Sequence, residues 1–65
     1  MWLEELRTEK KLTQLELAEM AGVDRATISK LENEKYSPSV GLAKKLGILL
    51  GFEWTKFYES QEKEG

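Results

Sequence analysis

The segment over residues 13–33 constrains the fold of this chain most, because it holds two helix starts separated by a single glycine. Thr13 and Glu16 have the spacing of a capping box, in which each side chain binds a free backbone amide at the start of a helix. Gly22 comes just after the apolar pattern of that helix, where a left-handed residue can end it without steric penalty. Asp24 is then in position to cap a second helix. The sequence therefore predicts two short helices joined by a tight turn.

The remaining chain is divided by turn signals into lengths that suit helices, and no stretch alternates apolar and polar residues as a strand does. We expect a first helix over residues 2–10, a fourth over residues 38–50 and a short fifth over residues 53–58. Gly41 and Gly47 lie inside the fourth helix, where each costs about 0.5–1 kcal/mol against alanine, so either can mark close packing. The sequence predicts an all-α fold of five helices.

The composition removes most catalytic and metal chemistry from consideration. The chain has 65 residues and contains neither cysteine nor histidine, so triads, Cys-His pairs and the usual transition-metal sites cannot form. It has no glycine-rich phosphate loop. Its longest near-apolar stretch, residues 47–52, is far shorter than the roughly 20 residues that span a membrane. We expect a small soluble cytoplasmic protein that is not an enzyme, does not span a membrane and has no cofactor or bound metal.

The formal net charge of −2 does not exclude a nucleic acid as the partner, because the charges are unevenly distributed. Residues 13–23 and residues 53–65 each carry −2, whereas residues 36–52 carry +2. Basic side chains gather in the middle of the chain. An acidic protein of this kind can still present one basic face.

Residues 14–33 resemble the helix-turn-helix of the Cro/C1-type (XRE) family, to which the lambdoid phage repressors and Cro belong. The resemblance extends from about residue 3 to residue 58, and several motifs match the family pattern in order. They are Leu6-Arg7, Leu12-Thr13-Gln14, Leu17-Ala18, Ala21-Gly22-Val23, Ile28-Ser29-Lys30-Leu31-Glu32-Asn33 and Pro38-Ser39, and the end over residues 50–58 resembles a common bacterial variety. The resemblance implies a lambda-repressor-like DNA-binding domain over residues 1–58, followed by a polar, frayed tail over residues 59–65.

The resemblance also implies roles for individual residues in binding double-stranded DNA. Base contacts are expected from the exposed side of the second motif helix, namely Arg25, Ala26, Thr27, Ser29 and Lys30. Phosphate contacts are expected from Gln14, Asn33 and Lys35, and Gln14 would also brace the recognition helix. Arg7 and Glu32 match a pair that forms an internal salt bridge in the family, and we expect them to be structural.

The chain departs from the family pattern at Glu34, where the family usually has glycine. Because a residue other than glycine tolerates the left-handed conformation poorly, we expect Asn33 to adopt it instead. Glu34 also places a negative charge where phosphates should pass. We therefore expect fewer backbone contacts there than the family usually makes.

The C-terminal part of the chain has more apolar residues than one small core needs. The residues concerned are Leu42, Ile48, Leu49, Trp54, Phe57 and Tyr58. The aromatic residues among them are most simply interpreted as core, but an exposed apolar patch usually marks an interface. In the resembled family, dimers form through this region. We therefore expect a homodimer built on these residues.

Two functions are compatible with the sequence. The first is a repressor-like transcriptional regulator that binds a near-palindromic operator as a homodimer, with its recognition helices in the major groove. The second is a protein-interaction module of helix-turn-helix type, such as an antitoxin or anti-regulator, that binds a regulatory protein partner and DNA only weakly. The net acidity, Glu34 and the apolar C-terminal surface favour the second. The salt dependence of DNA binding distinguishes the two, because several phosphate contacts give a steep slope.

Overall fold

A computed structural model describes residues 1–62, and within that part of the chain it contains five α-helices and no strand. The helices are α1 (Trp2–Glu9), α2 (Gln14–Ala21), α3 (Arg25–Glu32), α4 (Val40–Leu50) and α5 (Lys56–Glu62). The predicted all-α fold of five helices is confirmed. None of these helices is long and apolar enough to cross a membrane.

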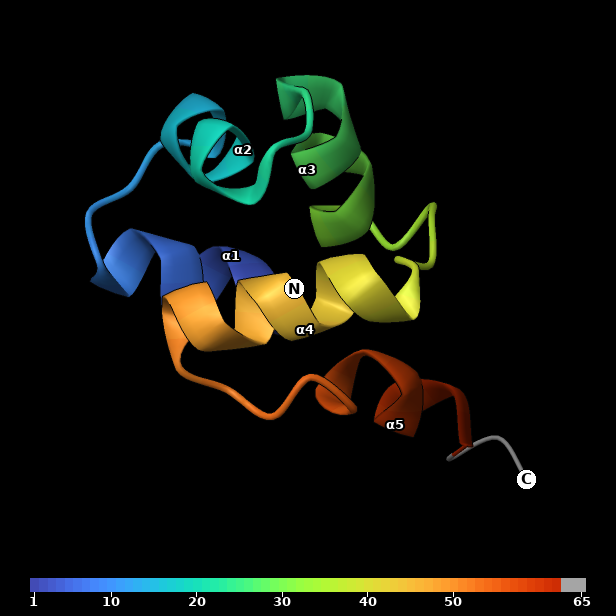
Figure 1. The fold of residues 1–65 in the computed structure, drawn as a ribbon. Coiled ribbons are helices and arrows are strands. Elements are labelled where there is room, and N and C mark those ends of the chain that lie inside the picture. The colour runs from blue at the N-terminus through green and yellow to red at the C-terminus, as the bar shows by residue number, and fades with distance from the viewer. Residues whose placement is uncertain (63–65) are drawn as a thin grey trace.

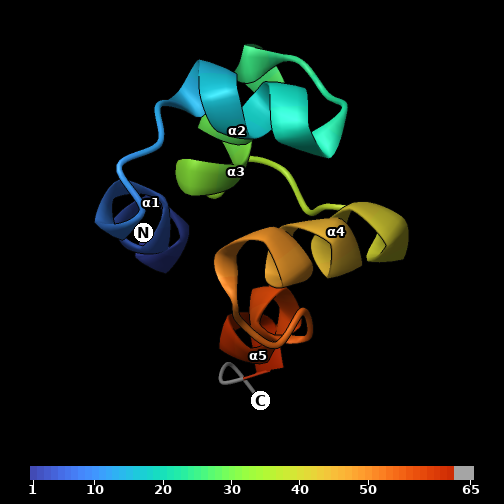
Figure 2. The ribbon, with the colours of Figure 1, turned by 60° about the vertical axis from the view of Figure 1, so that its left-hand side comes forward.

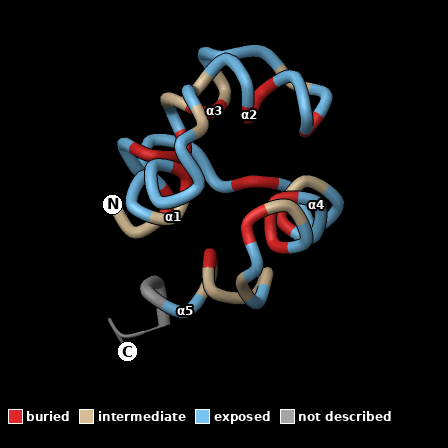
Figure 3. Tube along the Cα trace, turned by 90° about the vertical axis from the view of Figure 1, so that its left-hand side faces the viewer, coloured by how far each residue is buried: buried red, intermediate tan, exposed pale blue. Residues whose placement is uncertain are grey.

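The five helices surround one core (Figure 1). Helix α2 packs against α3 and α4, and α1 packs against α3. In both ribbon views α5 lies on the side of α4 that is turned away from α2 and α3 (Figure 2). The buried positions lie on the inward sides of the helices (Figure 3). The core consists of Leu3, Leu17, Ala18, Ala21, Ile28, Leu31, Ala43, Leu46, Leu50 and Phe57.

The helix-start and helix-end signals of the motif form as predicted. The Glu16 amide donates to Thr13 Oγ1 at 3.0 Å and the Thr13 amide donates to Glu16 Oε1 at 2.8 Å, which completes the capping box. Gly22 ends α2 in the left-handed conformation, with φ +76°. Asp24 Oδ1 accepts the Thr27 amide at 2.9 Å and so caps α3. The corner between the two helices is therefore specified by local chemistry.

The end of α3 differs from the expectation. Asn33 has φ −93°, whereas Glu34 has φ +60° and occupies the left-handed region. The Glu34 amide donates to the Leu31 carbonyl at 3.1 Å, and the Lys35 amide donates to the Lys30 carbonyl at 2.9 Å. These two bonds form a Schellman motif, which requires the left-handed residue one position after Asn33. The prediction that Asn33 adopts this conformation was wrong, because the hydrogen bonds decide the position.

Replacing Glu34 with glycine is expected to raise the free energy of unfolding by about 1 kcal/mol, because glycine adopts a positive φ without the clash that a Cβ causes. Urea unfolding followed by circular dichroism measures the change. Lys35→Gly is the control, since Lys35 is the next residue and is not in the left-handed region. Equal effects of the two substitutions would show that the backbone conformation of Glu34 is not strained.

Helix α5 begins later and ends later than predicted. Residues 53–58 are joined by short-range bonds, including the Lys56 amide to the Glu53 carbonyl at 2.9 Å and the Tyr58 amide to the Thr55 carbonyl at 2.8 Å. This i to i+3 pattern is a tight 3₁₀-type entry into the helix. The helix then continues through residue 62, into the predicted tail. The remainder of that tail, residues 63–65, lies outside the described residues.

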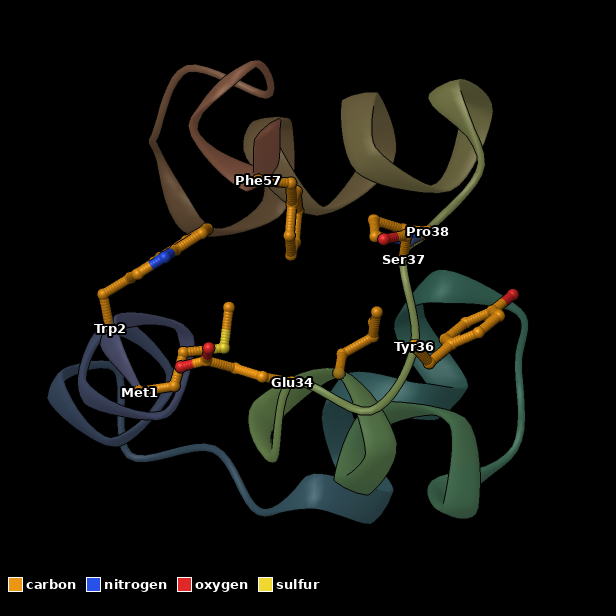
Figure 4. A pocket seen from close by; sticks show the side chains of 8 residues that line it. Met1, Trp2, Glu34, Tyr36, Ser37, Pro38 and Phe57 are labelled. Carbon is orange, nitrogen blue, oxygen red and sulfur yellow. The ribbon is translucent and has the colours of Figure 1, made fainter. Parts of the chain in front are cut away.

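A cavity of ≈ 240 Å³ lies where the start of α1, the end of α3, the α3–α4 loop and α5 meet. The side chains of Trp2 and Phe57 point toward it, and the side chain of Glu34 lies beside Met1 at its edge (Figure 4). The Tyr58 hydroxyl donates to the Pro38 carbonyl at 2.9 Å and so joins α5 to the loop. Glu34, the residue at which the chain departs from the family pattern, therefore borders this cavity.

Candidate nucleic-acid interface

Helix α3 separates a buried side from an exposed side. Ile28, Leu31 and Glu32 are buried against the rest of the molecule. Arg25, Ala26 and Lys30 are exposed, whereas Thr27 and Ser29 are half-buried. The residues predicted to contact bases therefore lie on a helix whose other side is buried against the core.

Some polar groups on α3 already have partners within the protein. The Thr27 hydroxyl donates to Asp24 Oδ1 at 2.6 Å. This bond, with the bond from the Thr27 amide, holds the pKa of Asp24 below its ordinary value of 3.8. The Asn33 side-chain amide donates to Ser29 Oγ at 3.5 Å. Arg25 and Lys30 are thus the exposed donors of this helix whose charged groups point outward from the core.

Helix α3 is held to α1 by a buried ion pair. Arg7 Nε lies 2.6 Å from Glu32 Oε2, and Arg7 Nη2 donates to Glu32 Oε1 at 3.3 Å. The two residues are only 9% and 6% exposed. Arg7 Nη1 also donates to the Leu12 carbonyl at 2.7 Å. The predicted structural pair is present, and it joins α1, α3 and the segment before α2.

Gln14 extends this network to α2. Its side-chain Nε2 donates to Glu32 Oε1 at 2.8 Å, so the first residue of α2 is bonded directly to the last residue of α3. Gln14 is half-buried. The structure therefore shows a direct bond between Gln14 and the helix that this residue is expected to brace. Its contact with a phosphate stays a prediction.

A groove of ≈ 620 Å³ lies at the start of α2, and the sequence did not point to some of its residues. It is lined by Arg7, Thr8, Lys11, Leu12, Thr13, Gln14, Leu15 and Arg25. All of the charged side chains in this lining are basic, and Arg7 is neutralised by Glu32. Lys11 and Arg25 therefore give the groove a positive charge next to Gln14. Lys11 was missed because its place depends on how the end of α1 meets α2 and α3.

The other residues expected at phosphates follow the end of α3, next to Glu32, to which Gln14 is bonded. Asn33 and Lys35 are exposed in the turn that leaves the helix. Arg25 is thus the first residue of α3, Lys30 lies within the helix, and Asn33 and Lys35 follow its last residue. Among the described residues, no group of three or more acidic side chains gathers as a metal site would require.

The residues expected at a dimer interface are only partly available for one. Phe57 is buried, and its ring lies 4.9 Å from Trp2 and 5.5 Å from Phe52, so it is a core residue and not part of an exposed patch. Leu42, Leu49, Trp54 and Tyr58 are half-buried and pack against the core. Ile48 alone among the six is broadly exposed. The predicted exposed patch was too large, because five of its six side chains are buried or pack against the core.

Helix-turn-helix DNA-binding regulators are defined as a class by two helices that a tight turn joins, here at Gly22. The second helix is exposed on one side and is held to the rest of the protein on the other. Comparison with known proteins agrees with this class. Residues 3–57 match the family model described as "Helix-turn-helix". The chain belongs to this helix-turn-helix family, which confirms the resemblance to Cro/C1-type (XRE) proteins.

Several named regulators are similar to the chain. The uncharacterized HTH-type transcriptional regulator YqaF of Bacillus subtilis is 47% identical over 58 residues, which cover 89% of this chain and 76% of that protein. The HTH-type transcriptional regulator PuuR of Escherichia coli is 33% identical over 61 residues, or 94% of this chain and 33% of PuuR. The immunity repressor protein of Bacillus phage phi105 is 35% identical over 48 residues, or 74% of this chain and 33% of the repressor. No solved structure gave a significant match.

Proposed function

We propose that this protein is a repressor-like transcriptional regulator that acts in the cytoplasm and binds a near-palindromic operator as a homodimer. Each protomer places α3 in a major groove, and the two recognition helices enter successive grooves about 34–36 Å apart. Arg25, Ala26 and Lys30 face base edges, with Thr27 and Ser29 at the margins of the contact. Gln14, Asn33 and Lys35 bind phosphates, joined by Lys11.

One observation carries this proposal: the exposed side of α3 adjoins a basic groove at the start of α2, and its buried side is bonded to both α1 and α2 through Glu32. Precise base contacts require side chains on an element that does not move relative to the phosphate contacts. The bond from Gln14 to Glu32 connects a phosphate candidate to the helix that carries the base candidates.

The proposal is tested by selecting bound fragments from random duplex DNA with the purified protein at about 0.15 M salt, which suppresses loose phosphate binding. Enrichment of a near-palindrome with half-sites one helical turn apart is the expected result. The absence of any enriched sequence would contradict the proposal and favour a protein partner.

Replacing Arg25 with alanine is expected to cost about 1–3 kcal/mol of binding free energy on the preferred site and to relax one base position, because the contact reads a base edge. Gln14→Ala is expected to weaken binding to all DNA sequences by a similar factor and to leave the preferred site unchanged. Quantitative binding to a panel of single-base variants of the site measures both effects.

The matched control is Arg25→Lys, which keeps the positive charge but loses the planar, bidentate guanidinium. We expect it to retain the non-specific affinity of the parent while losing preference at the same base position. If Arg25→Ala and Gln14→Ala gave the same loss at every position of the panel, the separate roles of these residues would be refuted.

The outer side of α2 favours a second candidate function, binding of a protein partner. Leu15 and Met20 are exposed there, and the exposed residues Glu16 and Glu19 lie between them in the sequence. Phosphates would be repelled by these carboxylates, so this face suits a protein. A weak dependence of DNA affinity on salt, together with no selected sequence, is the result that would make this the main function.

A further inference from the structure

A partly enclosed cavity lies beside the end of α3, and the proposed DNA contacts do not use it. Its volume is ≈ 240 Å³. An apolar cavity of about 150 Å³ is large enough to bind benzene, so a ring with a short chain fits in this one. Met1, Trp2 and Phe57 direct their side chains into it (Figure 4). The other lining residues are Leu31, Glu34, Tyr36, Ser37 and Pro38.

We propose that this cavity binds a small organic ammonium ion. The apolar body of the ligand packs against Trp2, Phe57 and Leu31, and its ammonium group pairs with the Glu34 carboxylate at the edge. Occupancy strengthens DNA binding, because the loop that forms one wall also carries two of the candidate phosphate contacts. The effect on DNA rests on the proposed function, whereas the ligand site does not.

Glu34 determines which charge the ligand carries. Among the described residues that line the cavity, it alone has a charged side chain. Its carboxylate has no hydrogen-bond or ion-pair partner within residues 1–62. An ammonium group at the edge of the cavity supplies that partner, whereas a carboxylate on the ligand would be repelled.

The backbone of Glu34 supports a role for its side chain. Glu34 has φ +60°, a conformation that glycine adopts without steric cost. The Schellman motif fixes this conformation, but its two backbone bonds require no side chain. A residue held in a strained conformation is a candidate for a function that needs its side chain at that place. Here the side chain places a carboxylate beside the cavity.

The walls of the cavity are held together by contacts between different elements. The Tyr58 hydroxyl donates to the Pro38 carbonyl at 2.9 Å and joins α5 to the loop. The ring centroids of Trp2 and Phe57 lie 4.9 Å apart, which joins α1 to α5. Pro38 and Phe57 are both buried. A site that is formed in advance binds a small ligand without a large cost in ordering.

The loop over residues 33–39 connects the cavity to the candidate DNA interface. Four of its residues line the cavity, and Asn33 and Lys35, the candidate phosphate contacts, belong to the same loop. A ligand that contacts the loop restricts its motion, so less ordering remains when DNA binds. The ligand and DNA therefore increase each other's affinity by the same factor.

The test uses 2-phenylethylamine as the probe, in an NMR titration of the full chain without DNA. We expect a saturable shift of the Trp2 indole signal with a dissociation constant of about 1 mM, which suits a ligand of this size. Trp54 is the control within the chain, because it lines a separate groove, and its indole signal is expected not to shift. Equal shifts of both indoles, or no shift of either, would overturn the site.

A neutral probe and a neutral variant test the charge of the ligand. 2-Phenylethanol has the same apolar body without the ammonium group. Glu34→Gln keeps the size of the side chain and is expected to weaken binding of the amine about fivefold and to leave binding of the alcohol unchanged. Glu53→Gln is the matched control, since this exposed glutamate lies outside the cavity. If the parent bound both probes equally, or Glu34→Gln bound the amine as the parent does, the assignment of an ammonium ligand would be overturned.

The effect on DNA is measured separately, at constant total salt, on a site selected with the unliganded protein. Saturating 2-phenylethylamine is expected to raise the affinity for this site about fivefold. An unchanged DNA affinity would overturn the coupling and leave the ligand site intact. If no DNA sequence is selected at all, the proposed function fails, and the titration without DNA still decides whether the cavity binds the amine.

Discussion

Replacing Arg7 with methionine is expected to reduce the free energy of unfolding by about 3–5 kcal/mol, because it leaves the buried carboxylate of Glu32 without its cationic partner. The substitution removes the bond at 2.6 Å to Glu32 and the bond at 2.7 Å to the Leu12 carbonyl. The bond from Gln14 remains, and a neutral amide cannot compensate the charge. Since small domains are stable by about 5–15 kcal/mol, this loss is a large fraction of the total.

Urea unfolding followed by circular dichroism measures this loss. If Arg7→Met does not fold on its own, the substitution is measured together with Glu34→Gly, which is expected to stabilise the protein. The double variant Arg7→Met/Glu32→Leu is the matched control. It removes both charges and is expected to recover most of the stability, because the penalty arises from the unpaired carboxylate and not from the absence of an ion pair. A cost below about 1 kcal/mol for Arg7→Met would mean that the pair behaves as an exposed one does.

The elements that could be predicted from the sequence are those specified by neighbouring residues. The capping box of Thr13 and Glu16, the left-handed Gly22 and the Asp24 cap depend on groups within a few residues of one another. These signals predicted the ends of α2 and α3 to within about one residue. The apolar residues Ile28 and Leu31 indicated which side of α3 is buried, whereas the candidate base contacts came from the resemblance to the Cro/C1-type family.

The parts that could not be predicted depend on contacts between distant elements. Gln14 is bonded to Glu32, 18 residues away, and the family resemblance, not the neighbouring sequence, was the reason to expect that Gln14 braces α3. Phe57 is buried because Trp2 and Phe52 meet it from other parts of the chain. Lys11 reaches the basic groove only because α1 ends beside α2. Packing, and not local propensity, decided these positions.

The end of α3 shows how a family comparison can mislead about a single residue. The absence of glycine suggested that the left-handed position would move to Asn33. The two Schellman hydrogen bonds keep it at Glu34, where the side chain accepts the strain. The two backbone hydrogen bonds together contribute roughly 1–3 kcal/mol, which offsets the roughly 1–2 kcal/mol that the left-handed conformation costs.

Replacing Gly47 with alanine is expected to destabilise the protein by about 1–3 kcal/mol, although alanine favours a helix. A Cβ at this position would lie 2.6 Å from the Phe52 carbonyl oxygen and 3.4 Å from the Trp54 amide nitrogen. Backbone atoms cannot move aside as the end of a flexible side chain can. The backbone carbonyl at this position accepts the Gly51 amide at 2.7 Å and the Phe52 amide at 3.0 Å, so the turn that would have to move is bonded to the same residue.

Gly41→Ala is the matched control within the same helix, and it is expected to have the opposite sign. A Cβ at Gly41 would meet nothing within 4 Å, so only the helix propensity changes and the protein gains about 0.5–1 kcal/mol. Urea unfolding compares the two variants directly. If Gly47→Ala also stabilised the protein, the turn over residues 51–54 would have room to move away from α4.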